Sequence, residues 1–526
     1  MMKNKFIYLS VLAFVFAGCE PEFENELSDS NYSAGDADFS SYVAIGNSLT
    51  AGFMDGTMSR VGQQYSFPNL LAQQFAVVGG GEFTQPPFDA DVDNLGGLLF
   101  NGNVIQPTRL IIDAGDGGPE NIAGTPTIDI TNQFAMAYNN MGVPGAKSFH
   151  LLAEGYGNIA GVPLGQANPY FARTATSPTA TVLGDAMSKN PTFFTNWIGN
   201  NDVLAFATSG GTGVNQEGNM NPATYGSNDI TDPTVFAGVY SQIINTLTSN
   251  GAKGVVATIP DVTSIPFFTT VPYNPLSASV IGDGDAAVGQ ATIQQLNQQL
   301  YGPLKQALTA FGQGSRINLL NPNGNNPLLI TDETLSNLAP QLTAALTMAG
   351  FEPQLAAFLG NAYGRARQAT ASDLVLLSTR AAIGAAPQGA PAPFNLFGIT
   401  YPLQDQHILI PSETSVVATA TASFNQSIRQ IAASKNLAVA DMNQILNQLV
   451  SGLRTEDGQI YTADYFSTST ISTVLFSLDG IHPNARGYAV IANEVLKVIN
   501  DHYNAKLPLV SAGNYPGATV LPSNAN

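Results

Sequence analysis

Three short motifs, far apart in the chain, carry side chains that could act together on a substrate. Residues 46–50 read GNSLT, and a serine in a sharp turn can present its hydroxyl as a nucleophile. Residues 197–202 read WIGNND, in which an asparagine amide could donate a hydrogen bond to a developing oxyanion and Asp202 could cap the following helix. Residues 477–483 read SLDGIHP, and the imidazole of His482 has an ordinary pKa of about 6.5, which suits it to accept a proton from a hydroxyl near neutral pH. These residue types indicate nucleophilic catalysis by a serine.

Two neighbouring features support this interpretation. Asp479 lies three residues before His482, close enough for its carboxylate to hold the second ring nitrogen and stabilise the imidazolium. Residues 140–146 read NMGVPGA, a strand-to-helix turn in which the backbone N–H of Gly145 could supply another donor. Taken singly, each motif could be an ordinary turn or a surface histidine after a turn. Their combination favours the catalytic interpretation.

The elements that would position these groups alternate between strand and helix. Strand-like runs are found at 42–45, 134–138, 193–198, 254–259 and 437–440, and helical patterns at 67–75, 416–433 and 484–502. Such alternation predicts an α/β fold with a parallel sheet covered on both faces. Reactive groups in these sheets sit in loops at the carboxyl ends of the strands, which is where the motifs fall.

The set resembles the SGNH, or GDSL-type, family of serine hydrolases. Residues 46–49 match its first block, Gly145 its glycine block, residues 199–202 its Gly-x-Asn-Asp block and residues 479–482 its Asp-x-x-His block, in family order. The resemblance implies a three-layer α/β/α sandwich, flavodoxin-like in topology, with ester hydrolysis that needs no metal or other cofactor.

The resemblance also implies a role for each matching residue. Ser48 would be the nucleophile, His482 the base and Asp479 the residue that orients it. The backbone N–H groups of Ser48 and Gly145 and the side-chain amide of Asn201 would form the oxyanion hole.

The chain departs from the family pattern in two ways. Asn47 stands where the first block usually has an aspartate, which bears on the hydrogen bonding of the Ser48 turn and not on the triad. The chain is also larger than a minimal member, with an irregular excursion at about 79–130 and an apolar, mainly helical insertion at about 283–400. The insertion could form a lid or a wall for an acyl chain, but packing onto the main domain is the simpler interpretation. Its apolar helical positions are Leu335, Leu338, Leu342, Leu346, Phe351, Leu355, Phe358, Leu359, Leu374, Leu376 and Leu377.

The amino-terminal segment predicts export. Residues 1–18 have a basic start, an apolar stretch and a small-residue end, as in a signal peptide. The ending resembles a bacterial lipobox, which implies acylation of Cys19, the only cysteine; an ordinary secretory signal is the alternative. Residues 19–38 then form a flexible tether, 39–506 the hydrolase domain and 507–526 an extended tail.

These features together predict an outer-membrane lipoprotein of the cell envelope of a Gram-negative bacterium. The acidic cluster at 20–26 resembles signals that direct lipoproteins of some Gram-negative groups to the outer leaflet, while a solvated spacer explains it equally well. Outside the leader, no run of 18 apolar residues would span a bilayer.

Composition limits the classes of partner. The 526 residues include 19 Lys and Arg against 38 Asp and Glu, a formal charge of −19, so nucleic acid is not an expected partner. Apolar residues make up 44% and charged residues 11%, enough material for a core, which excludes disorder throughout. The single tryptophan, Trp197, is expected to pack in the core beneath the Asn201 loop.

The remaining histidines and a cluster of aspartates are weaker candidates for a catalytic or metal-binding role. His150, His407 and His502 lack an accompanying carboxylate and strand-end serine, so each is expected to be a surface or satisfied core residue. The aspartates at 89, 91 and 93 alternate like the start of a calcium loop, but Phe100 stands where a bidentate glutamate is needed. No metal site is therefore expected.

The sequence predicts a membrane-anchored ester hydrolase that works through an acyl-enzyme. Its partners would be an ester substrate, either a lipid or an acylated glycan, and the membrane that holds its lipid anchor. Lipid or acyl esters are favoured over acetylated glycans because the insertion is apolar. A carbohydrate acetyl esterase and a non-catalytic surface binding lipoprotein remain alternatives.

Overall fold

The computed structural model describes residues 32–113, 118–456, 458–467 and 469–521. The predicted signal peptide, Cys19 and most of the predicted tether lie outside these ranges. No helix within them is both long enough and apolar enough to cross a bilayer.

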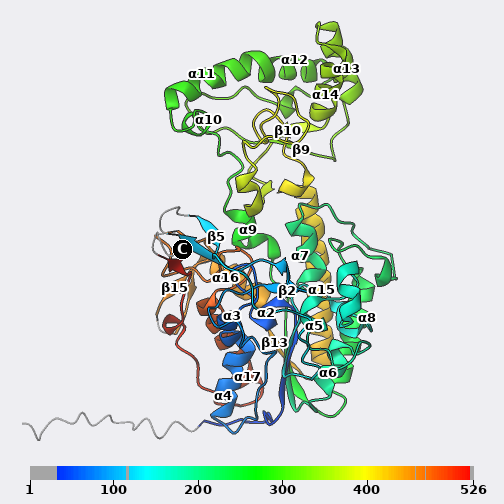
Figure 1. The fold of residues 1–526 in the computed structure, drawn as a ribbon, viewed down its shortest axis with the longest axis vertical. Helices are drawn as coiled ribbons and strands as arrows, with labels where there is room; N and C mark the ends of the chain where they lie inside the picture. The colour runs from blue at the N-terminus through cyan, green and yellow to red at the C-terminus, as the bar shows by residue number, and fades with distance from the viewer. Residues whose placement is uncertain (1–31, 114–117, 457, 468, 522–526) are drawn as a thin grey trace, which may run out of the picture.

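A five-stranded parallel sheet forms the centre of the lower body (Figure 1). Its strands, in spatial order, are β6 (Asn140–Gly142), β1 (Tyr42–Gly46), β7 (Phe193–Trp197), β8 (Lys253–Ala257) and β13 (Ala438–Ala440). Their side chains are mostly buried, as expected for strands covered on both faces. Gly46 pairs with Gly142 on one side and Trp197 on the other, so three strands end together at one edge.

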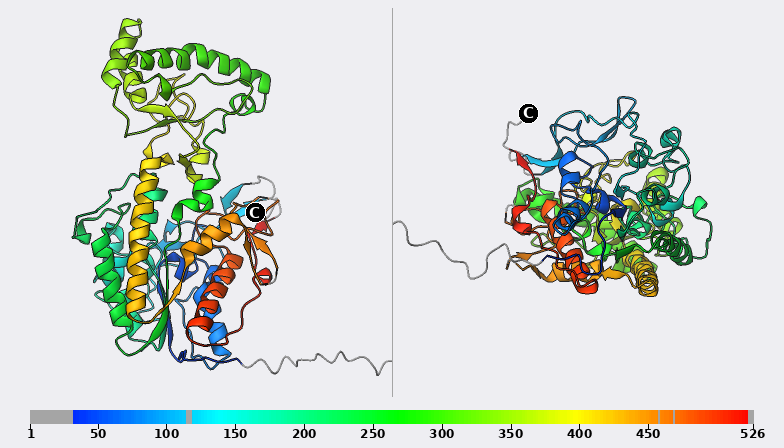
Figure 2. Two further views of the ribbon diagram at one scale, coloured as in Figure 1. Left: turned by 180° about the vertical axis from the view of Figure 1, so that it is seen from behind. Right: turned by 90° about the horizontal axis from the view of Figure 1, so that it is seen from below.

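Helices cover both faces of this sheet (Figures 1 and 2). On one face α4 (Phe67–Ala76) packs against α17 (Ala485–His502), and on the other α8 (Pro233–Leu247) packs against α15 (Pro411–Ser434) and α6 (Val182–Met187). Side-chain caps begin several of these helices; Asn484, for example, accepts a hydrogen bond from the N–H of Gly487. The predicted parallel α/β arrangement is confirmed.

One predicted strand is wrong. Residues 134–138 form no strand, and the sheet instead uses β6, a few residues later. Phe134 and Met136 are 44% and 51% exposed, so their side chains do not enter the core. The ring of Phe134 covers the guanidinium of Arg173 instead, which explains an apolar residue in a non-strand segment.

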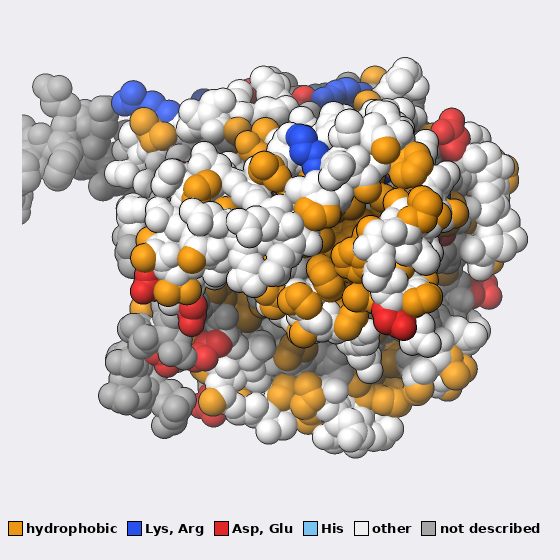
Figure 3. All heavy atoms as spheres, turned by 90° about the horizontal axis from the view of Figure 1, so that it is seen from above, with side chains coloured by type: hydrophobic (Ala, Val, Ile, Leu, Met, Phe, Trp, Pro, Cys, Tyr) orange, Lys and Arg blue, Asp and Glu red, His pale blue; other side chains and the backbone are white. Residues whose placement is uncertain are grey.

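The segment predicted as a helical insertion forms a second lobe above the body (Figure 1). The lobe begins before the predicted boundary at about 283, with α10 (Ala278–Ile281). Its other helices and strands are α11 (Ala286–Leu296), α12 (Gly302–Ala310), α13 (Ala339–Met348), α14 (Pro353–Tyr363), β9 (Leu329–Thr331) and β10 (Ala366–Gln368). Two apolar clusters of its own fill it, and apolar side chains also gather on its upper face (Figure 3).

Two expectations about this lobe need correction. Because it has its own core, it stands on the body instead of lying flat against it. Residues 374 and 375 are not helical: they form β11 (Leu374–Val375), which pairs with β12 (Ile408–Leu409) where the chain returns to the body.

The irregular excursion and the chain ends are anchored by short strand pairs. Within the excursion, β2 (Leu98–Phe100) pairs with β3 (Asn103–Gln106) and β4 (Leu110–Asp113) with β5 (Pro119–Asn121). The predicted tail is docked, because β16 (Val520–Leu521) lies parallel to β4. The end of the predicted tether is docked too: the N–H groups of Ser33 and Asp36 donate to the carbonyls of Lys506 and Tyr503.

Candidate active site

The Ser48 turn is built by its neighbours. Strand β1 ends at Gly46, and Asn47 caps α2 (Ser48–Ala51) by accepting a hydrogen bond from the N–H of Leu49 at 3.0 Å. A Cβ at Gly46 would lie 2.6 Å from the carbonyl oxygen of Trp197, so the bend needs glycine. Asn47 thus supplies a cap that an aspartate could also supply, and Ser48 is held at the first position of the helix.

Ser48, His482 and Asp479 form one hydrogen-bonded chain. His482 Nε2 lies 2.9 Å from Ser48 Oγ, although the two residues are 434 positions apart. The other ring nitrogen, Nδ1, lies 2.9 Å from Asp479 Oδ2. The structure therefore brings together the serine, imidazole and carboxylate singled out in the sequence.

Asp479 is held in its ionised form by a dense set of donors. Its Oδ1 accepts from the N–H groups of Ile481 and His482, both at 2.8 Å, and from the hydroxyl of Ser477 at 3.0 Å. The N–H of Gly56 donates to Oδ2 at 3.0 Å. Burial raises the pKa of Asp479, but the His482 charge and these hydrogen bonds outweigh it and lower the pKa to about 2.

A second buried carboxyl, Asp55, lies beside this aspartate. Its Oδ1 accepts from the N–H of Leu478 at 3.1 Å, while its own N–H donates to Ser477 Oγ at 3.0 Å. Burial raises the pKa of Asp55, the hydrogen bond from Leu478 and the charge of Arg109 oppose the rise, and the charge of Asp479 adds to it, so that the pKa lies at about 7. Sequence reasoning missed Asp55; the Asp-Gly turn at 55–56 was the only local signal.

The three predicted oxyanion donors come from Ser48, the first residue of α2, from the turn at Gly145 and from Asn201, the first residue of α7 (Asn201–Thr208). The Nδ2 of Asn201 donates to the carbonyl of Ala146 at 2.9 Å. Gly145 is exposed and has φ +80°, a conformation that favours glycine. A primary amide carries two N–H donors, so Asn201 keeps one after binding Ala146.

Asp202 does not cap its helix, contrary to the sequence expectation. It is fully buried and accepts hydrogen bonds from the N–H and hydroxyl of Ser148, at 2.8 and 2.7 Å, and from the hydroxyl of Thr231 at 2.7 Å. Burial raises its pKa, while these bonds and the charge of Lys147 oppose the rise. Asp202 thus fastens the loop that follows Gly145 to the start of α7.

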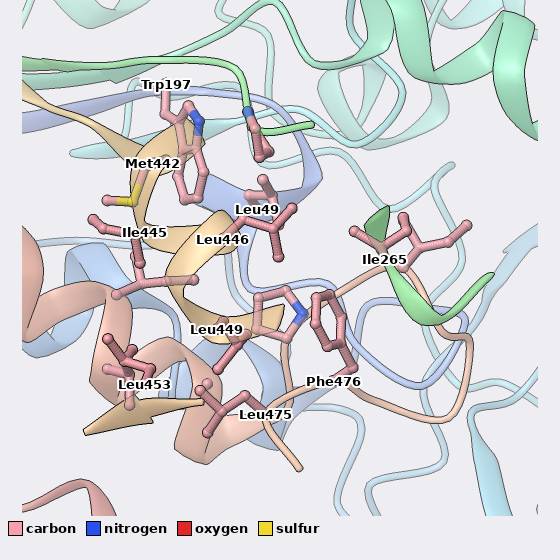
Figure 4. A pocket seen from close by; sticks show the side chains of 16 residues that line it. Leu49, Trp197, Ile265, Met442, Ile445, Leu446, Leu449, Leu453, Leu475 and Phe476 are labelled. Atoms are coloured by element: carbon pink, nitrogen blue, oxygen red, sulfur yellow. The ribbon is translucent and has the colours of Figure 1, made fainter. Parts of the chain in front are cut away.

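Figure 4 shows an apolar pocket whose lining includes sequence neighbours of two triad residues. Leu49, next to Ser48, lines it together with Ile481 and Pro483, which flank His482. Its volume is about 100 Å³. The other lining residues are Trp197, Pro260, Ile265, Met442, Ile445, Leu446, Leu449, Leu453, Leu475, Phe476, Gly487, Val490 and Ile491. Trp197 is buried, as predicted, and its Nε1 donates to the carbonyl of Thr258 at 3.2 Å.

The second lobe meets the site only through its base. None of the described residues between 283 and 400 lines the apolar pocket, so the body and not the insertion supplies the apolar wall. Below the lobe, α9 (Pro266–Thr269) contacts the loop of Asp479, with the N–H of Phe267 donating to the carbonyl of Gly480 at 2.9 Å. Leu377 also packs closely over Gly480.

The three other histidines and Asp91 form hydrogen bonds with the backbone. His150 and His407 each accept a backbone N–H at Nδ1, and His502 contacts the carbonyl of Asn436. In the calcium-like stretch, the carboxylate of Asp91 accepts the backbone N–H groups of residues 60, 95 and 96. Asp91 therefore braces its loop.

No protein-family model, no curated protein and no solved structure is similar to this chain at a significant level. The resemblance to the SGNH family therefore depends on the four motifs and the geometry they adopt.

Proposed function

We propose that this chain is a serine ester hydrolase of the SGNH type, built on a three-layer α/β/α fold. One observation carries the proposal: Ser48, His482 and Asp479 are joined by hydrogen bonds of 2.9 Å at the carboxyl edge of a parallel sheet. The ionised state of Asp479 supports it, because a carboxylate at that place stabilises the imidazolium formed during the reaction.

The proposed reaction has two stages. His482 Nε2 accepts the hydroxyl proton of Ser48 as Oγ attacks the ester carbonyl carbon, and the resulting tetrahedral oxyanion collapses to an acyl-enzyme. The departing alcohol takes the proton from His482. A water molecule then attacks the acyl carbon, with His482 again accepting and returning the proton, so Ser48 and the carboxylic acid are released.

Three donors would stabilise the oxyanion. The N–H of Ser48 stands at the first position of α2, where no intrahelical acceptor exists. The N–H of Gly145 and the remaining N–H of Asn201 would complete the set, positioned by the Ala146 and Asp202 contacts. Such donors stabilise the transition state more than the substrate because charge develops on the oxygen only there.

The apolar pocket favours an acyl ester over an acetylated glycan. An acetyl group would leave its apolar walls without contact, whereas a longer acyl chain would bury against them. A cavity of about 150 Å³ in another protein binds benzene, so about 100 Å³ corresponds to about four carbon atoms. We expect the best acyl chains to be about four to six carbons long.

Labelling with a fluorophosphonate probe tests the catalytic proposal without knowledge of the substrate. The wild-type protein should be labelled and Ser48→Ala should not. Ser177→Ala, which removes an exposed serine, is the matched control and should label normally. Equal labelling of Ser48→Ala would refute the assignment, and a folded wild-type protein that resists labelling would favour the non-catalytic binding alternative.

A rate profile over p-nitrophenyl esters of two to sixteen carbons tests the acyl preference. We expect the maximum kcat/KM near butyrate or hexanoate, because longer chains exceed the pocket. Leu449→Phe, which adds volume to the lining, should shift the maximum to shorter chains. A maximum at acetate in the wild-type protein would instead support an acetyl esterase.

We also propose that the mature protein is held in the cell envelope by a lipid on Cys19. In fractionated cells, the wild-type protein should sediment with membranes and Cys19→Ser should not. Sedimentation of both proteins to the same extent would contradict the anchor.

A further inference from the structure

Arg173 differs from the other buried arginines of this protein. Three arginines are less than 9% exposed: Arg109, Arg173 and Arg316. The guanidinium of Arg109 donates to the carbonyl of Asn94, and that of Arg316 donates to a glutamine side chain and to two backbone carbonyls. Arg173 is 3% exposed; within the described ranges its buried Nε has no hydrogen-bond acceptor, and no carboxylate forms an ion pair with its guanidinium.

The described groups around Arg173 leave its guanidinium protonated but do not supply a carboxylate to form an ion pair with it. Its guanidinium lies between two aromatic rings, 4.7 Å from the centre of Phe88 and 5.5 Å from that of Phe134. Burial lowers its pKa to about 10, against the opposing effects of Tyr138 and Asp89, so the group stays protonated at neutral pH. A buried cation without a partner is costly, and an anion is the ligand that would offset that cost.

Arg173 also lines a small cavity next to the catalytic loops. Ala51, at the end of α2, forms one wall, and Gly142 and Pro144, which precede Gly145, form another. The volume of about 30 Å³ has room for two or three water-sized groups, because one water molecule needs about 10–15 Å³. The close packing of α2 on β6 at Gly142 fixes this cavity relative to Ser48.

The two cavities flank the helix of the nucleophile. Leu49 faces the apolar pocket and Ala51 the Arg173 cavity, and residues two apart in a helix project about 200° from one another. Ser48 precedes both residues in α2 and lines neither cavity itself. An ester bound at Ser48 could place its acyl chain in the apolar pocket and an acid group of its alcohol part in the Arg173 cavity.

We propose that the Arg173 cavity binds a carboxylate-sized anion. The anion is either an acid group of the substrate or a free small acid. The substrate version rests on the proposed hydrolase function, whereas binding of a free anion does not. A guanidinium–carboxylate contact in such a site corresponds to about tenfold to a hundredfold in affinity.

Two measurements test the proposal. The first is the thermal midpoint of the Ser48→Ala protein in rising acetate, with neutral acetamide as the matched control ligand; it needs no turnover. The second compares kcat/KM for O-butyrylglycolate and O-butyrylglycolamide, which differ only in carboxylate against carboxamide. Each is made with Arg173, Arg173→Gln and Arg173→Lys.

A control variant separates the charge of Arg173 from a general loss of positive charge. Arg365→Gln removes an exposed arginine of the second lobe. It should not change anion binding more than about threefold, whereas Arg173→Gln should abolish binding and Arg173→Lys should retain part of it.

The outcomes are distinct. A preference of about tenfold or more for the glycolate ester that disappears in Arg173→Gln identifies the substrate as the source of the anion. Stabilisation by acetate that depends on Arg173, without an ester preference, identifies a free anion. If Arg173→Gln changes neither measurement, or if Arg365→Gln reproduces its losses, the proposal is wrong. Absence of turnover with intact acetate binding would refute the hydrolase function alone.

Discussion

Buried charges are arranged differently in the two lobes. In the upper lobe, the guanidinium of Arg367 donates to Asp332 at 2.6 Å and to both oxygens of Asp373 at 2.7 Å. Thr334 and Thr370 satisfy further positions on these carboxylates, so the network closes on itself. Every strong donor in it has a partner inside the protein.

In the body, the buried charge of Asp202 is likewise partnered, but two other polar groups end at a cavity. The chain from Asp479 through His482 stops at the Ser48 hydroxyl, whose neighbour Leu49 lines an apolar pocket, and Arg173 has no ion-pair partner among the described residues. A closed network stabilises a fold, whereas a chain that ends at a cavity leaves its last group for a ligand. Buried charged groups whose partners all lie inside the protein can thus be distinguished from those that are left to contact a ligand.

The largest expected effect comes from removing the hydroxyl of Ser48, the last group in the hydrogen-bonded series from Asp479 through His482. Ser48→Ala should lower kcat for a butyrate ester by on the order of 10⁶-fold, because no other group can form the acyl-enzyme. The thermal midpoint should change little, since one hydroxyl is lost. Steady-state kinetics and calorimetry on the same preparation measure both; retained turnover would break the comparison.

Removing Arg367 from the closed network of the upper lobe should have the opposite result: stability falls and turnover is retained. Arg367→Met leaves Asp332 and Asp373 buried without their cation, which should cost ~3–5 kcal/mol of unfolding free energy in the upper lobe. Ester turnover of the folded protein should stay within about twofold. Hydrogen exchange in the upper lobe and kinetics below its melting temperature are the measurements, and Arg365→Gln is the exposed control.

An oxyanion donor should have a smaller but purely kinetic effect. Asn201→Ala should lower kcat by about 10²–10³-fold with little change in KM, because its amide acts mainly on the transition state. Asn245→Ala, on the exposed side of α8, is the matched control. A loss confined to KM would mean that Asn201 binds substrate instead.

The smallest effect concerns Asp55, whose folded-state pKa of about 7 lies above its ordinary value of 3.8. The folded protein keeps this proton while the unfolded chain loses it, so this contribution to stability is present below pH 4 and is lost as the pH rises through 7. Asp55→Asn has no carboxyl that can ionise at this position, so it does not lose this contribution to the unfolding free energy as the pH rises.

Relative to wild type, the unfolding free energy of Asp55→Asn should therefore rise by ~2–4 kcal/mol between pH 4 and pH 8. Chemical denaturation at several pH values measures it, with the exposed Asp501→Asn as control. A difference that does not vary with pH would show that Asp55 is not protonated in the folded protein.

Local pattern was sufficient for the elements that carry the triad. Strands β1, β7 and β8 and helices α15 and α17 have strong periodicity or buried β-branched runs between clear turns, so their sequence alone predicted them. The order of the motifs along those strands also indicated which side chains would meet.

The failures share a physical cause, which is contact between distant segments. Phe134 has strand-like neighbours, but its ring lies over the guanidinium of Arg173 and not in the sheet. Asp202 stands at a capping position but is drawn inward by Ser148. The role of Asp55 depends on a loop 423 positions away, which no local pattern reports.

The intrinsic fluorescence of Trp197 can report on the apolar pocket. It is the only tryptophan in the chain, and its ring forms part of the wall beside Leu446 (Figure 4). Emission excited at long ultraviolet wavelength therefore comes from one place in the molecule, within reach of whatever fills that cavity. Occupancy by a non-hydrolysable ligand can be followed in the unmodified protein, without a dye and without turnover.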